Sequence, residues 1–152
     1  MADDDERREM RGGCLCGAVR YRAMASSDAY LCHCRMCQRA TGGVAAALTS
    51  VRQADVTWET EPAWFQSSPI ARRAHCGRCG TPLAFAYLEG CDDMDLTVGS
   101  FDDPAAFVPT GHYGAESLLE RWLDTRELPR TRSDEHAPLV RRWEQARADR
   151  HD

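Results

Sequence analysis

The sequence predicts a mainly β fold of short strands, with short helices towards the C-terminus. Apolar or alternating runs of about four to eight residues recur between turn-forming residues, which is the pattern of short strands. The two longer runs with helical periodicity come after residue 114. Seven of the eight cysteines lie in three tight clusters. Clustered thiolates bind zinc, so we expect metal sites to supply stability that a small core cannot.

Length and charge restrict the class of protein. A chain of 152 residues is long enough for one domain with a core of its own. Its formal net charge is −5, which argues against nucleic acid or a membrane as the main partner, because both favour a basic surface. No apolar run approaches the roughly 20 residues of a membrane helix, and the charged start of the chain is unlike a signal peptide. We therefore expect a cytoplasmic protein with reduced thiols.

Lysine is absent, so all 19 basic residues are arginine. Arginine stays protonated, and no side-chain amine is available to form a Schiff base. Any aldehyde chemistry would therefore use thiols and a metal.

The first elements lead into the cysteine clusters. Residues 1–11 are strongly charged and predict a disordered tail. Cys14 and Cys16 lie two residues apart, so both sulfurs point the same way on an extended chain. The alternating segment 17–23 predicts a strand, and the short apolar segment 29–31 approaches the central cluster.

The middle of the chain predicts one helical turn and several strands. Residues 34–40 suit a short helix that ends at Gly42. The apolar run 44–51 predicts a buried strand. Further strands are predicted at 56–59, 63–66, 82–87 and 94–98.

Two segments near the C-terminus have helical periodicity. Residues 115–125 place an apolar face on one side of a helix, and Pro138 suits the first turn of a helix that continues to about residue 147. The segment 127–135 between them reads as a surface linker. The predicted organisation is a tail over 1–11, a zinc-binding domain over 12–125, and a linker with a C-terminal helix over 126–152.

The cysteine clusters divide into two metal sites. Two clusters hold a pair each: Cys14, Cys16, Cys76 and Cys79. The third holds three: Cys32, Cys34 and Cys37. Structural zinc takes four protein ligands, whereas catalytic zinc keeps three and one exchangeable position. We therefore predict two zinc ions per chain, a structural ion on the two pairs and a catalytic ion on the three central cysteines.

Other readings of the central cluster remain open at this stage. It could be a second closed site with a fourth ligand chosen from His33, His75, His112 and Cys91. Cys91 lies apart from the clusters, which favours a free thiol. Arg35 and Arg39 flank the central cysteines and could receive the carboxylates of a thiol substrate, although solvated surface arginines are the alternative.

The motifs around the cysteines occur in a specific order. They are Gly13-Cys14-Leu15-Cys16-Gly17-Ala18-Val19-Arg20-Tyr21, Cys32-His33-Cys34-Arg35-Met36-Cys37-Gln38-Arg39, His75-Cys76-Gly77-Arg78-Cys79-Gly80-Thr81-Pro82-Leu83, Gly99-Ser100-Phe101-Asp102-Asp103-Pro104, and His112-Tyr113 before Trp122. From about Gly12 to Trp122 the chain resembles the glutathione-dependent formaldehyde-activating enzyme family, which also contains centromere protein V.

This resemblance implies a β-tent fold, in which short antiparallel sheets are joined by zinc knuckles. It also implies the same division into a structural and a catalytic zinc site. The activity it implies is condensation of formaldehyde with glutathione to S-(hydroxymethyl)glutathione, a carbon–sulfur lyase reaction.

Three hypotheses about function follow. The protein is a zinc-dependent carbon–sulfur lyase whose partners are a thiol such as glutathione and a small aldehyde. Alternatively, it binds such a thiol without turnover, or both zinc sites are closed and the surface serves a protein partner. The sequence leaves the oligomeric state open.

Overall fold

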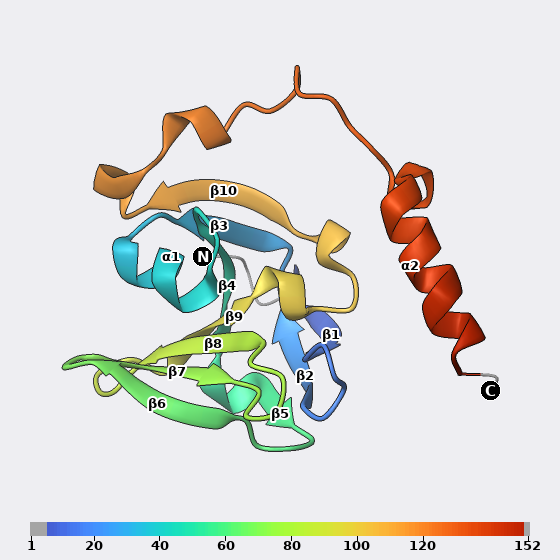
Figure 1. The fold of residues 1–152 in the computed structure, drawn as a ribbon. Coiled ribbons are helices and arrows are strands. Elements are labelled where there is room, and N and C mark those ends of the chain that lie inside the picture. Colours follow the sequence, from blue (N-terminus) through green and yellow to red (C-terminus); the bar gives the residue numbers. More distant parts are fainter. Residues whose placement is uncertain (1–5, 151–152) are drawn as a thin grey trace. The chain divides into compact units, whose positions relative to one another are not determined.

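The computed structural model describes residues 6–150 and consists of two compact units that divide between Leu119 and Glu120 (Figure 1). The predicted domain boundary lay slightly later, after residue 125. The first unit contains both sheets and all the cysteines, and the second contains the C-terminal helix.

The first unit is built on a three-stranded and a seven-stranded sheet. The smaller sheet has the order β1 (Arg8–Gly13), β2 (Arg20–Ala25), β5 (Val56–Trp58). The larger sheet has the order β10 (Val108–Tyr113), β3 (Asp28–Cys32), β4 (Ala46–Arg52), β9 (Asp93–Thr97), β8 (Pro82–Tyr87), β7 (Ala71–His75), β6 (Ala63–Ser68). Neighbouring strands are antiparallel except for β10 and β3, which are parallel. The mainly β prediction is therefore confirmed.

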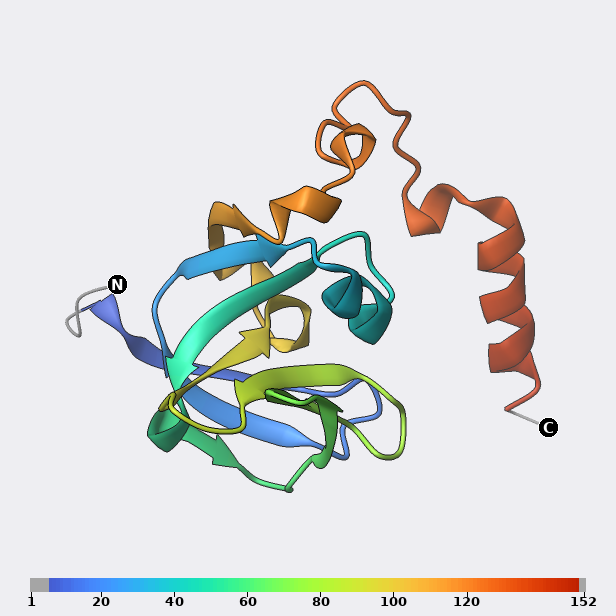
Figure 2. The same cartoon turned by 90° about the vertical axis from the view of Figure 1, so that its left-hand side faces the viewer.

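The core lies between the two sheets, and the larger sheet is strongly curved around it (Figure 2). Tyr21 on β2 is 1% exposed and its ring packs edge-on against Trp58 and Phe101. Its hydroxyl shares a hydrogen bond of 2.7 Å with Ser100. The phenol thus fills the interior with apolar surface while its polar end stays satisfied.

Two of the predicted helices are confirmed, the one that ends at Gly42 and the one that has Pro138 in its first turn. Helix α1 (Arg35–Thr41) is capped at its N-terminus by Cys34, whose sulfur accepts a hydrogen bond from the Cys37 amide, and at its C-terminus by Gly42, which has φ of 75°. Helix α2 (Ala137–Ala148) has Pro138 in its first turn. Further 3-10 turns lie at Gln53–Asp55, Val98–Ser100, Pro104–Ala106, Ala115–Ser117, Glu120–Trp122 and Ser133–Glu135.

The predicted disordered tail over 1–11 is wrong for its last part. Strand β1 pairs with β2 along its whole length, and Met10 is buried at 9% exposure. Glu9 and Arg11 on the other face stay exposed and form an ion pair of 3.5 Å. The charged residues therefore belong to the outer face of an edge strand. Their number alone does not distinguish such a strand from a disordered tail. Residues 1–5 of the predicted tail lie outside the described residues.

The predicted helix over 115–125 is also wrong. The segment forms two separate 3-10 turns, because Leu118 between them has extended dihedral angles of −65° and 133°. The apolar side chains Leu119, Trp122 and Leu123 are 46%, 62% and 42% exposed. A helix of this length depends on packing of its apolar face, and these side chains lack such burial.

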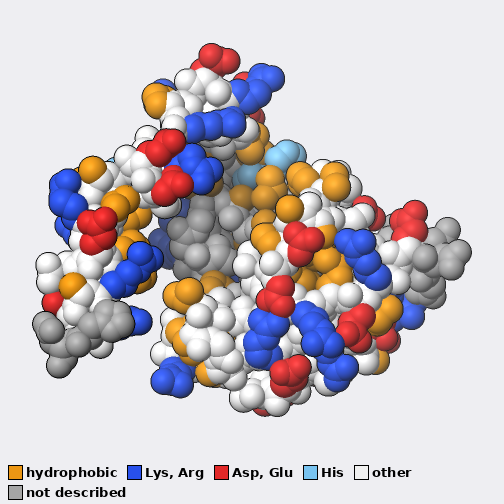
Figure 3. Space-filling view, turned by 90° about the vertical axis from the view of Figure 1, so that its right-hand side faces the viewer, with side chains coloured by type: hydrophobic (Ala, Val, Ile, Leu, Met, Phe, Trp, Pro, Cys, Tyr) orange, Lys and Arg blue, Asp and Glu red, His pale blue; other side chains and the backbone are white. Residues whose placement is uncertain are grey.

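Charged side chains of both signs are interspersed over the face drawn in Figure 3. Arg20 and Asp102 form a two-pronged ion pair of 2.8 and 2.6 Å, and the guanidinium holds the pKa of this carboxyl below its usual range.

Within residues 6–150 no helix has the length and apolar character needed to cross a bilayer.

The buried strand β9 gives a first test of this fold. Leu96 in this strand is fully buried, so Leu96→Ala should lower the free energy of unfolding by about 2–5 kcal/mol through lost burial and a residual cavity. Urea denaturation measures this loss. Leu15→Ala is the matched control, because that side chain is 91% exposed, and an equal loss in both variants would contradict the fold.

Candidate functional site

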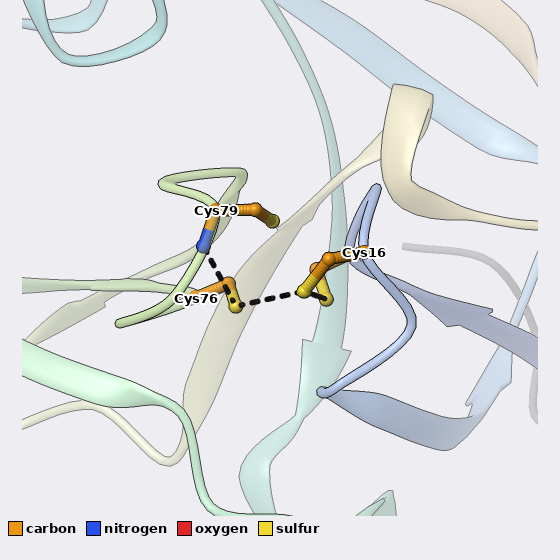
Figure 4. Close-up of side chains that lie close together, drawn as sticks. Cys16, Cys76 and Cys79 are labelled. Atoms are coloured by element: carbon orange, nitrogen blue, oxygen red, sulfur yellow. Dashed lines mark hydrogen bonds between the residues drawn. The ribbon is translucent and has the colours of Figure 1, made fainter. Parts of the chain in front are cut away.

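Four cysteines from two distant loops meet between the sheets. Cys14 and Cys16 lie in the loop from β1 to β2, and Cys76 and Cys79 lie in the loop from β7 to β8 (Figure 4). Their sulfur atoms all lie within 4.8 Å of one another. The sulfurs of Cys14 and Cys16 are 3.6 Å apart, and those of Cys16 and Cys76 are 3.8 Å apart. Tetrahedral zinc with bonds of about 2.3 Å separates its sulfurs by about 3.8 Å, so this cluster fits zinc.

Each loop presents its sulfurs from a hydrogen-bonded turn that ends at a glycine. The amide of Gly17 donates to the carbonyl of Cys14, and that of Gly80 donates to the carbonyl of Cys76. Both glycines have φ of 80°, a conformation that other residues rarely adopt. Amides also point at sulfur: Val19 donates to Cys14 at 3.2 Å and Cys79 donates to Cys76 at 3.4 Å. These bonds favour thiolates, which are the form that binds metal.

Thr81 connects the two loops. Its hydroxyl donates to the sulfur of Cys79 at 3.2 Å and accepts from the amide of Leu15 at 3.0 Å. The hydroxyl bond is the main reason that the pKa of Cys79 falls to about 5. Cys79 is thus prepared as a thiolate ligand at neutral pH.

The other three clustered cysteines meet at the junction of β3 and α1. Cys32 ends β3, Cys34 caps α1 and Cys37 lies in the first turn of α1. Their sulfurs lie within 4.8 Å of one another. Burial raises the pKa of Cys32 to about 12. Burial also acts on Cys34, but hydrogen bonds led by the Cys37 amide bring its pKa below the ordinary value. Three neighbouring thiols cannot all ionise without a cation, so this cluster, called the cysteine trio below, also fits a metal.

Within residues 6–150 the trio forms a metal cluster of three sulfurs without a further His, Asp, Glu or Cys. His33 points elsewhere: its Nε2 lies 2.8 Å from Nδ1 of His112, and its ring is 2% exposed. Cys91 is exposed in the loop between β8 and β9. The described residues therefore give no support to a fourth protein ligand.

The trio lines a pocket of about 490 Å³. The pocket wall consists of Tyr30, Cys32, Cys34, Met36, Cys37, Leu48, Ser50, Ser68, Ile70, Ala71, Arg73, Phe85, Tyr87, Asp95 and Tyr113. A largely apolar concavity with a few polar groups at one end is typical of small-molecule sites.

Comparison with known proteins now identifies the family. The sequence model described as glutathione-dependent formaldehyde-activating enzyme matches residues 9–116, which is more than half of the chain. The chain belongs to this family. The match confirms the resemblance and includes all seven clustered cysteines.

Two further comparisons give a sequence relative and a solved structure with a similar fold. A protein of Schizosaccharomyces pombe named as an uncharacterized lyase is 31% identical over 83 residues, which are 54% of this chain and 61% of the relative. The chain thus matches less than two thirds of that relative. A crystal structure of a Rhodobacter sphaeroides protein, a structural-genomics target, has a TM-score of 0.56 and 21% identity. It covers 68% of this chain and 99% of its own, and supports the fold.

In this member of the family the arginine at the trio is Arg73, which the sequence reading missed. Its Nη2 donates to the sulfur of Cys37 at 3.4 Å, and its guanidinium lies 4.9 Å from the ring centre of Phe85. The side chain is buried at 7% exposure. Alternation from the buried Ala71 along β7 points Arg73 inward, and that is the signal that could have found it.

The predicted substrate-binding arginines lie elsewhere. Arg35 donates to the amide oxygen of Gln38, and Arg39 is exposed in the last turn of α1. Neither belongs to the pocket wall. Their role towards a substrate carboxylate stays a prediction.

A group of three polar side chains in the pocket wall was also missed. Burial raises the pKa of Asp95 above its ordinary value, although hydrogen bonds from Tyr30 and Ser50 act against this. Burial likewise raises the pKa of Tyr30 far above that of a free phenol. The three side chains lie on different strands, so only the fold brings them together.

Removal of one knuckle ligand tests the structural zinc site. A structural zinc supplies roughly 10–16 kcal/mol of apparent binding free energy, against a net domain stability of about 5–15 kcal/mol. Cys79→Ser should therefore lose about one zinc per chain by elemental mass spectrometry and should unfold or melt far below the parent protein. Cys91→Ser is the matched control and should keep two zinc ions. Full zinc content in Cys79→Ser would contradict the site.

Arg73 offers a second test. Arg73→Met keeps the volume but removes a charge-assisted bond to Cys37, which is worth about 1.5–3 kcal/mol. We expect zinc affinity at the trio to fall by about tenfold or more, measured by competition with a chromophoric chelator. Arg72→Met is the control, because that guanidinium lies over Trp64 instead. Equal affinities in the two variants would contradict a role for Arg73 at the trio.

Proposed function

We propose that this protein is a zinc-dependent carbon–sulfur lyase that joins a small thiol to a small aldehyde, and separates them again, in the manner of an S-(hydroxymethyl)glutathione synthase. The observation that carries the proposal is a three-sulfur cluster in the wall of a pocket of about 490 Å³. Family membership and the lyase-named relative support it.

The cysteines divide into two roles under this proposal. Cys14, Cys16, Cys76 and Cys79 hold a structural zinc, since their four sulfurs satisfy its coordination. Cys32, Cys34 and Cys37 hold the catalytic zinc. A zinc ion with three protein ligands supplies one exchangeable position that stabilises a substrate thiol as thiolate near neutral pH.

The addition itself requires one bond and one proton transfer. The thiol sulfur forms a bond to the carbonyl carbon, and the electron pair of the carbonyl double bond moves to oxygen. That oxygen takes up a proton in place of the one that the thiol lost. Tyr30 and Ser50 are hydrogen-bonded to Asp95 in the same pocket as the trio, and we assign the exchange of this proton to these three groups.

Arg73 balances charge at the catalytic cluster. Three thiolates exceed the charge of a divalent cation by one, which weakens its attraction for an electron-rich substrate. The guanidinium that donates to Cys37 compensates this excess from a buried position. Arg73 is therefore a positioning residue that acts through Cys37.

The partners in this proposal are a small-molecule thiol, of which glutathione is the example that the family description gives, and a small aldehyde such as formaldehyde. The place of action is the cytoplasm, where glutathione keeps thiols reduced. The net charge of −5 and the interspersed surface charges support a small-molecule role over nucleic-acid binding.

The decisive variant is Cys37→Ser. NMR measures the rate of exchange between glutathione, formaldehyde and their adduct. After subtraction of the uncatalysed rate, we expect the rate of the variant to be at least about 100-fold lower than that of the parent protein, which corresponds to about 2.7 kcal/mol in activation free energy. The melting temperature should stay close to that of the parent protein, in contrast to Cys79→Ser.

Other results separate the alternative functions. Glutathione binding by calorimetry without any rate above background would indicate a thiol-binding protein. Unfolding of Cys37→Ser to the same degree as Cys79→Ser would indicate two structural zinc sites.

A further inference from the structure

The entrance of the trio pocket carries an unusual group of exposed apolar side chains. Met36, Ile70, Tyr87 and Tyr113 are 55%, 63%, 46% and 62% exposed, and all four belong to the pocket wall. They come from α1, the β6–β7 turn and the ends of β8 and β10. Single exposed apolar residues are normal, but four that converge on one opening mark a binding surface.

The pocket offers no unused positive charge. Arg73 is the one cation and Asp95 the one carboxylate among its lining residues. The guanidinium of Arg73 is already engaged with the sulfur of Cys37 and the ring of Phe85. Glutathione carries more carboxylates than ammonium groups, so its charged ends would find no partner here.

These features define a substrate class within the proposed function, on which this inference rests. We propose that the thiol–aldehyde adduct of this protein carries an uncharged, apolar group of about the size of an aromatic ring. The sulfur of the adduct lies at the trio, and the apolar group packs against Ile70, Tyr87 and Tyr113. Charged substituents are disfavoured because burial without a counter-ion costs free energy.

The size of the pocket supports a small molecule as the occupant. Its volume of about 490 Å³ falls in the range of roughly 300–1,000 Å³ that small-molecule sites occupy. The trio in the wall gives such a molecule a reactive anchor, which a protein surface would not require.

Thiol binding provides the first experiment. Phenylmethanethiol, mercaptoethanol and glutathione are titrated into the zinc-loaded full chain by calorimetry. We expect phenylmethanethiol to bind at least about tenfold more tightly than either of the others. Equal or tighter binding of glutathione would overturn the inference and leave the proposed function intact. Failure of all three thiols to bind would overturn both.

Two variants connect this preference to the apolar entrance. The double variant Ile70→Ser, Tyr87→Ser should reduce the preference to less than about threefold, because it removes apolar surface at the opening. Leu88→Ser is the matched control, since this leucine is 41% exposed, follows Tyr87 and does not line the pocket. An unchanged preference in the double variant would overturn the inference.

Adduct formation then shows which half carries the apolar group. Phenylmethanethiol with formaldehyde presents it on the thiol, and mercaptoethanol with phenylacetaldehyde presents it on the aldehyde. We expect kcat/KM for one of these pairs to exceed that for mercaptoethanol with formaldehyde by about tenfold or more. If neither pair exceeds it, the inference is wrong.

Discussion

The meeting of four sulfur atoms between two loops is the constraint on which the rest of the fold depends. One loop joins β1 to β2 in the smaller sheet, and the other joins β7 to β8 in the larger. A sheet of three short strands has little stability of its own. The smaller sheet is also linked to the segment that follows β9, by an isolated bridge between Gly12 and Phe101 and by the hydrogen bond of Tyr21 to Ser100. Metal bound by both loops would add a set of bonds that connects the two sheets directly.

The cysteine trio is assembled in a different way. Its three sulfurs come from six consecutive residues, so local geometry almost alone brings them together. Cys34 serves as helix cap and as metal donor, since its sulfur accepts from the amide of Cys37. Gln38 then fixes the helix by donating to the carbonyls of Val44 and Ser117. A rigid local unit can thus face an open pocket, whereas the four-sulfur cluster joins two separate loops.

The sequence predicts those parts of the structure that depend on residues close to one another in the chain. Ligand spacing indicates how the cysteines divide, and a cap followed by Gly42 defines α1. Strand β10 was missed because Pro109 and Gly111 interrupt its pattern, and its pairing with β3 depends on residues about 80 positions away. Arg73 and Asp95 were missed for a similar reason: each is an ordinary charged residue until neighbouring strands bury it. The helix predicted over 115–125 is wrong for the opposite reason. Its local apolar pattern suits a helix, but most of its apolar side chains are exposed.

The choice of arginine at position 73 follows from the chemistry proposed for the pocket. A buried lysine loses its proton readily and would then present a free amine to an aldehyde, with which it forms a Schiff base. A guanidinium remains charged under the same burial and does not act as such a nucleophile. Its guanidinium also lies over the ring of Phe85 while one N–H reaches Cys37, a combination that the compact ammonium group of lysine would not reproduce. Arginine is therefore the basic side chain that can stay beside the thiolate cluster as a permanent counter-charge without consuming the substrate.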